Sequence, residues 1–118
     1  MKGRSLIVDD DASMCDMLAV GLKKRSFEPV CVTTGAEALE AMSTQDFDVV
    51  VTDVNMRGLS GIELCQRVVE NRPDMPVIVI TAFGSMETAI AAMRAGAYDF
   101  IPKPVDMDAL EFALDRGI

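Results

Sequence analysis

Five polar side chains stand at the ends of short apolar runs in this sequence. Asp9 and Asp10 end the first run, and Asp53, Thr81 and Lys103 stand at the ends of three others. If the runs are parallel strands, their carboxyl ends meet at one edge of a sheet, where open parallel sheets bind ligands. We therefore expect three carboxylates, a hydroxyl and an ammonium group to share one site.

Three converging carboxylates need a compensating cation. At an effective dielectric constant near 20, two carboxylates about 4 Å apart repel each other by about 4 kcal/mol. Mg²⁺ fits such a cluster because it binds a few carboxylate oxygens, retained waters and a phosphate oxygen rather than a full cage of protein ligands. The sequence has no histidine and no suitably spaced thiols for zinc. The expected cofactor is therefore Mg²⁺.

A carboxylate beside such a cation can attack a phosphoryl group and become an acyl phosphate. The transferred group spreads its charge over its oxygens, so the site needs electrostatic partners more than it needs a base. Lys103 supplies a positive charge and Thr81 a hydroxyl donor. An aspartate after a strand is also a common helix cap, and we interpret Asp11 and Asp106 as caps. The joint placement of the other five residues favours a site.

Short apolar runs alternate along the chain with segments of helical periodicity, which predicts strands and helices in turn. Three of the runs are rich in β-branched residues without polar alternation, as in strands covered on both faces of a parallel sheet. The runs span residues 6–8, 30–32, 49–51, 77–80 and 100–101. Five strand-helix units with right-handed crossovers predict an α/β fold with one doubly wound parallel sheet.

Capping residues and apolar stripes mark the helices between the runs. Asp11 or Ser13 is expected to cap the first helix. The buried stripe of that helix is predicted to consist of Met14, Met17, Leu18 and Leu22. The predicted boundaries of the later helices are a capping box at Thr34, a stop at Asn71 and Pro73, a cap at Ser85, a stop at Gly96 and a cap at Asp106.

Length and composition limit the classes of function. A chain of 118 residues with 50% apolar content predicts a single domain with its own core. The net charge of −8 repels phosphate backbones, so direct binding of nucleic acid is not expected. The first apolar run is too short for a signal peptide or a membrane span. Cys15, Cys31 and Cys65 are interpreted as small buried hydrophobic residues in a reducing cytosol, and the expected location is cytoplasmic.

The motifs together resemble the receiver domains of two-component response regulators over essentially the whole chain. Residues 6–10 resemble the family's acidic pair, 49–53 its phosphoacceptor strand, 80–82 its switch threonine, and 101–104 its lysine with a proline that often has a cis bond. The resemblance implies a flavodoxin-like (βα)5 sheet with strand order 2-1-3-4-5, an order carried over from the family. It also implies that residues 1–118 are one receiver domain and that output domains lie outside this chain.

The resemblance implies a role for each site residue. Asp53 would accept the phosphoryl group from a sensor histidine kinase, because this chain has no histidine of its own. The implied ligands of Mg²⁺ are the side chains of Asp10 and Asp53, the backbone carbonyl of Asn55 and, through water, Asp9. Thr81 and Lys103 would contact the phosphoryl oxygens. The protein would be a signalling switch rather than an enzyme with turnover.

Residues 82–89 and 95–100 look most like receivers of NtrC-type transcriptional activators, which carry an ATPase domain and a DNA-binding domain after the receiver. Thr81 and Phe100 would form the switch, acting on an output domain or a homodimer through the fourth helix, fifth strand and fifth helix. Phe100 lacks a hydroxyl, so its part must depend on packing. Two departures from the family pattern are Arg57, where proline is common, and Ser60, where an acidic residue is common.

Two other classes of function remain open. A phosphohydrolase of the haloacid-dehalogenase kind could use Asp9 and Asp11 as its aspartate pair, although it would need a cap or a longer sheet. An interaction module that keeps the fold but has lost the chemistry is the other alternative. Such a module would be expected to lack one of the acidic, threonine or lysine positions, and all of them are present here.

Overall fold

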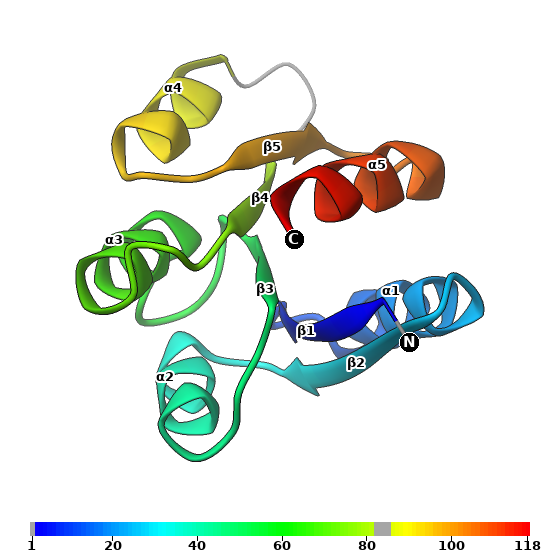
Figure 1. The fold of residues 1–118 in the computed structure, drawn as a ribbon. Helices are drawn as coiled ribbons and strands as arrows, with labels where there is room; N and C mark the ends of the chain where they lie inside the picture. The colour runs from blue at the N-terminus through cyan, green and yellow to red at the C-terminus, as the bar shows by residue number, and fades with distance from the viewer. Residues whose placement is uncertain (1, 82–85) are drawn as a thin grey trace.

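The computed structural model describes residues 2–81 and 86–118. Within these residues, five parallel strands form one sheet in the order β2-β1-β3-β4-β5 (Figure 1). The strands are β1 (Gly3–Val8), β2 (Phe27–Val32), β3 (Val49–Asp53), β4 (Val77–Thr81) and β5 (Asp99–Pro102). The helices are α1 (Ala12–Lys24), α2 (Gly35–Thr44), α3 (Gly61–Asn71), α4 (Met86–Arg94) and α5 (Met107–Gly117). The predicted α/β fold and strand order are confirmed.

Helices cover both faces of the sheet, with α1 and α5 on one face and α2, α3 and α4 on the other (Figure 1). Successive side chains of a strand point to opposite faces, so the central strands contribute to both layers. In β1, Leu6 packs with the α2–α4 layer and Ile7 with the α1 and α5 layer. Every residue of β3 and β4 is buried, which explains why these strands read as continuous apolar runs.

The strand register aligns the carboxyl ends that carry the candidate residues. Val8 of β1 is opposite Thr52 of β3, so Asp9 and Asp53 follow at the same level. The next pairing places Asp53 opposite Ile80 of β4, one residue before Thr81. Thr81 is in turn opposite Pro102 of β5, the residue before Lys103. The sheet therefore brings all four strand ends to one edge.

Three of the predicted helix caps are confirmed. Asp11, and not Ser13, caps α1, and its carboxylate accepts hydrogen bonds from the backbone amides of Ser13 and Met14. Thr34 caps α2 and Asp106 caps α5. The predicted capping box of α2 is half formed, because the carboxylate of Glu37 accepts from the amide of Thr33 rather than that of Thr34.

The remaining boundaries of the helices agree closely with the sequence. Helix α3 ends at Asn71 as predicted, and α4 ends at Arg94, just before Gly96 with its positive φ of 100°. The predicted cap Ser85 lies outside the described residues. None of the helices in the described ranges is long and apolar enough to cross a membrane.

Two sequence interpretations of single residues are wrong. The predicted buried stripe of α1 includes Met17, but its side chain is 53% exposed, because the helix turns Cys15 toward the sheet beside Leu18 and Leu22. Cys31 was expected to be buried, but it is exposed, since β2 is an edge strand with a solvent-facing side. Cys15 and Cys65 are buried as expected.

Candidate functional site

The three aspartates form one cluster at the carboxyl edge of the sheet. Asp9, Asp10 and Asp53 each offer a carboxylate oxygen, and these oxygens lie within 4.8 Å of one another. Asp9 and Asp53 are buried, whereas Asp10 is exposed. Buried and partly buried like charges repel strongly unless a cation or protons neutralise them. The predicted convergence of the carboxylates is therefore present.

Asp9 shows the electrostatic strain of the cluster most clearly. Its Oδ1 accepts a hydrogen bond of 2.9 Å from the backbone amide of Asp11, but its buried Oδ2 has no hydrogen-bond partner among residues 2–81 and 86–118. Burial raises the pKa of Asp9, as do the charges of Asp53 and Asp10, and they outweigh the lowering by the Asp11 amide and by Lys103. A hard divalent cation would satisfy the unpartnered oxygen, so these residues fit Mg²⁺.

Lys103 supplies the positive charge at this edge. Its Nζ lies 2.9 Å from Oδ1 of Asp53, and its backbone amide donates a 2.8 Å hydrogen bond to the carbonyl of Thr81. Burial lowers the pKa of Lys103, but the hydrogen bond and the charge of Asp53 raise it by more. The pKa therefore lies above its ordinary value, and the ammonium group stays charged at neutral pH. The peptide bond to Pro104 is cis. The side chain of Lys103 thus pairs with Asp53, and its backbone is bonded to Thr81 at the end of β4.

The loop between β3 and α3 contacts the cluster through its backbone. The amide of Arg57 donates a 3.3 Å hydrogen bond to Oδ2 of Asp10. Proline at this position would have no such donor. Asn55 lies exposed in the same loop, and the use of its carbonyl as a magnesium ligand stays a prediction. The sequence alone shows Arg57 only as a departure from the family pattern, since no pattern reveals which acceptor a loop amide meets.

The first residue of α3 packs directly against the last residue of β3. A Cβ on Gly61 would collide with the carbonyl oxygen of Asp53 and lie 2.8 Å from Val54 Cα, so only glycine fits there. The amide of Gly61 donates a 2.9 Å hydrogen bond to the carbonyl of Val54. Ser60, the other departure in the sequence, caps α3 and forms a full capping box with Glu63. These contacts fix the backbone around Asp53.

The two predicted switch residues lie at different depths. Thr81 is buried at the end of β4, on the same edge as Asp53. Phe100 of β5 is 37% exposed and lines an apolar hollow of about 360 Å³ beside α4. Its partners there are Met86, Ala89, Ile90, Met93 and Arg94. The structure thus gathers Asp9, Asp10, Asp53 and Lys103, and leaves Phe100 on the outer surface.

Asp11 is not one of the three aspartates whose carboxylates converge in the cluster. Its Oδ1 accepts the amides of Ser13 and Met14 at 3.0 and 3.4 Å, which is the geometry of a helix cap. The phosphohydrolase alternative would need this side chain for acid-base chemistry, so the capping role weighs against it.

Residues 5–115 match the family model described as the response regulator receiver domain. The chain belongs to this family. The receiver domain is 37% identical over 113 residues to the transcriptional regulatory protein GlrR of Escherichia coli K12, an alignment that covers 96% of this chain and 26% of that protein. It is 34% identical over 117 residues to the DNA-binding transcriptional regulator NtrC of Klebsiella pneumoniae, covering 99% of this chain and 25% of that protein.

Solved receiver structures have the same fold. A response regulator from Chloroflexus aurantiacus superposes with a TM-score of 0.94 at 31% identity, covering 98% of this chain and 96% of that one. The predicted resemblance to receivers of NtrC-type transcriptional regulators is confirmed. The receiver domain spans about a quarter of the length of the curated relatives that it matches.

Proposed function

We propose that this receiver domain is a phosphoacceptor switch in which Asp53 takes a phosphoryl group from a sensor histidine kinase. The observation that carries the proposal is the pairing of Asp53 with Lys103 at 2.9 Å beside two further carboxylates. A nucleophilic carboxylate needs neighbouring positive charge more than a base, because the transferred group carries its charge on its oxygens. Asp53 is also the aspartate at the end of β3 whose backbone the first residue of α3, Gly61, packs against.

The chemistry follows from this arrangement. A carboxylate oxygen of Asp53 forms a new P–O bond as the P–N bond of the donor phosphohistidine breaks, and the imidazole leaves with the bond's electron pair. Because its ammonium group already pairs with Asp53, Lys103 is close enough to donate a hydrogen bond to an oxygen of the transferred phosphoryl group. Asp9, Asp10, Asp53 and the carbonyl of Asn55 would hold Mg²⁺, Asp9 through water. When bound, Mg²⁺ neutralises the carboxylates and the phosphoryl oxygens.

The proposed readout begins at Thr81. Its hydroxyl would turn toward a phosphoryl oxygen of Asp53, because the new charge attracts a hydrogen-bond donor. The vacated space would let the outward-facing Phe100 rotate inward. Full burial of an exposed side chain of this size stabilises by about 1.5–3 kcal/mol. Phe100 is 37% exposed, so burying the remainder would contribute about 0.5–1 kcal/mol. A gain of this size shifts a two-state population ratio about two- to sixfold, so Phe100 would supply part of the switching energy.

The same proposal assigns partners. The face of α4, β5 and α5 would engage an output domain of the full-length protein or a second copy of the receiver. Because GlrR and NtrC are regulators of transcription by name, we propose a transcriptional output and a cytoplasmic location. We expect no direct contact of this domain with nucleic acid, since its net charge is −8.

Intact-mass measurement after incubation with acetyl phosphate and Mg²⁺ tests the function. We expect the mass of one phosphoryl group to be added to the wild type and lost when a chelator replaces Mg²⁺. Asp53→Asn should remove the increment, because the amide is a far weaker nucleophile of the same shape. Asp106→Asn is a matched control, because Asn also caps helices and the residue begins α5. An increment that persists in Asp53→Asn would refute the proposal.

A further inference from the structure

Two thiols meet where α1 packs against the edge strand β2. The thiol of Cys31 donates a hydrogen bond of 3.2 Å to the carbonyl oxygen of Cys15. The Cys15 thiol is buried and lies 3.8 Å from the carbonyls of Ile7 and Val32. Burial raises the pKa of Cys15, and its hydrogen bond to the Cys31 side chain raises that pKa further. The Cys31 thiol therefore contacts the backbone of Cys15 directly.

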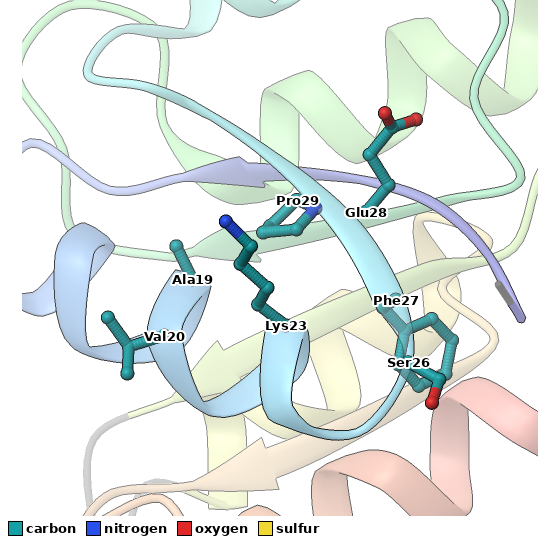
Figure 2. A pocket seen from close by; sticks show the side chains of 7 residues that line it. All are labelled: Ala19, Val20, Lys23, Ser26, Phe27, Glu28 and Pro29. Carbon is teal, nitrogen blue, oxygen red and sulfur yellow. The ribbon is translucent and has the colours of Figure 1, made fainter.

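One member of the pair is open to solvent. Cys31 is exposed, and alternation along β2 places it on the same face as Phe27 and Pro29. Those two residues line a groove of about 640 Å³ between β2 and α1, whose other wall includes Ala19 (Figure 2). Cys15 lies one helical turn before Ala19 on α1. Neither cysteine lines the groove itself, but Cys31 is exposed two residues after Pro29, so a small oxidant can reach it.

We propose that Cys15 and Cys31 form a reversible disulfide that links α1 to β2. The oxidant is a low-molecular-weight disulfide such as oxidised glutathione. The Cys31 thiolate attacks one sulfur of that disulfide, breaks its S–S bond and releases one glutathione thiolate. The Cys15 thiolate, which is scarce because burial raises the pKa of Cys15, then attacks Cys31 Sγ and releases the second glutathione, so this second step is the slow one. The two thiol protons pass to the two released thiolates, so the protein loses two electrons and glutathione disulfide gains them.

The disulfide would form next to the acidic cluster. The carbonyl of Val32, which Cys15 Sγ approaches at 3.8 Å, also accepts a 3.2 Å hydrogen bond from the backbone amide of Asp9. Bonding Cys15 to Cys31 changes the position of the sulfur at this shared carbonyl. We therefore expect oxidation to alter the surroundings of the Asp9 amide. A consequence for phosphoryl transfer rests on the function proposed above, whereas the disulfide itself does not.

Mass spectrometry of the native chain treated with oxidised glutathione tests the disulfide. We expect the mass of two hydrogen atoms to be lost, a peptide containing linked Cys15 and Cys31, and full reversal by dithiothreitol. Cys65→Ala is the matched control. It should give the same linked product, because Cys65 lies on α3, on the opposite face of the sheet from α1. Cys31→Ser, at an exposed position, should lose it. Glutathione attached to Cys31 alone, a link to Cys65, dimers between chains, or no reaction would each overturn the proposal.

Amide NMR of the reduced and oxidised chain tests the link to the cluster. The Asp9 amide resonance should shift on oxidation in the wild type and stay in place in Cys31→Ser treated with the same oxidant. If the disulfide forms but the Asp9 resonance does not move, the coupling of the thiol pair to the acidic cluster is wrong.

Discussion

Replacing Asp9 with asparagine should stabilise the metal-free receiver domain at neutral pH. At 4.8 Å and an effective dielectric constant of 20, two unit charges interact by about 3.5 kcal/mol. Asp9 is repelled in this way by Asp53 and Asp10, and it is attracted by Lys103. Because one attraction offsets one of the two repulsions, the net interaction of Asp9 is about that of one repulsive pair. Solvent around the exposed Asp10 weakens this net repulsion. Asparagine keeps the oxygen that accepts the Asp11 amide.

The expected gain in the free energy of unfolding for Asp9→Asn is about 1–3 kcal/mol, after this weakening is included. Each kcal/mol corresponds to a rise of roughly 3–6 °C in the midpoint for a domain of this size. The sign depends on pH, because the pKa of Asp9 is raised above its ordinary value of 3.8 in the folded state. The free energy of unfolding of the wild type therefore falls as the pH rises from 3.8 through the raised pKa of Asp9. Asp9→Asn has no carboxyl group to titrate at this position, so its free energy of unfolding should not fall for this reason.

Thermal unfolding in a chelator and in Mg²⁺ measures both parts of this prediction. In the chelator, Asp9→Asn should melt above the wild type. Mg²⁺ at about ten times its Kd should stabilise the wild type by about 1.4 kcal/mol and the variant by less. Asp46→Asn removes the same charge from an exposed loop residue and serves as the control. If Asp9→Asn melts below the wild type, or no differently from Asp46→Asn, the repulsion argument is wrong.

Substitutions at three further residues test other contacts of the site. Thr81→Ala should keep phosphorylation but lose the changes in amide NMR shifts across α4 and β5 on adding beryllofluoride; equal shifts in both proteins would rule out coupling through Thr81. Arg57→Pro removes the amide that donates to Asp10 and should weaken Mg²⁺ binding about three- to tenfold, because a typical hydrogen bond contributes about 0.5–1.5 kcal/mol and this one is long and exposed. Arg57→Ala keeps the amide and should bind Mg²⁺ nearly as the wild type does; equal weakening in both would assign the effect to the side chain. Gly61→Ala should destabilise the fold by about 1–3 kcal/mol in urea unfolding, because its Cβ meets the Asp53 backbone, and an unchanged midpoint would contradict that packing.

The candidate site was largely predictable because strand ends and residue types are local features of the sequence. Four of the five apolar runs are followed within two residues by a site residue, and parallel pairing brings those ends together whatever the exact length of the helices between them. The joint positions of Asp9, Asp53 and Lys103 follow from this rule. The ion pair of Lys103 with Asp53 needs only that β5 lie two strands from β3.

Features that depend on three-dimensional neighbours were missed. Periodicity alone could not tell Met17 from Cys15, because both lie near the sheet-facing side of α1 and the exact rotation of the helix decides which is buried. The contact of Cys15 with Cys31 joins residues whose spacing carries no motif. Likewise the amide of Arg57 finds Asp10 only through the path of a loop. Such contacts become visible only in the folded chain.

The most direct test of the central claim is to locate the phosphoryl group. Borohydride reduces an acyl phosphate to an alcohol, so reduction after treatment with acetyl phosphate and Mg²⁺ marks the acceptor residue permanently. Peptide mapping should then find homoserine in place of Asp53 in the wild type. Reduction at Asp9, Asp10 or Asp11, or no reduced aspartate in a protein that has gained phosphoryl mass, would contradict the assignment of Asp53 as the phosphoacceptor.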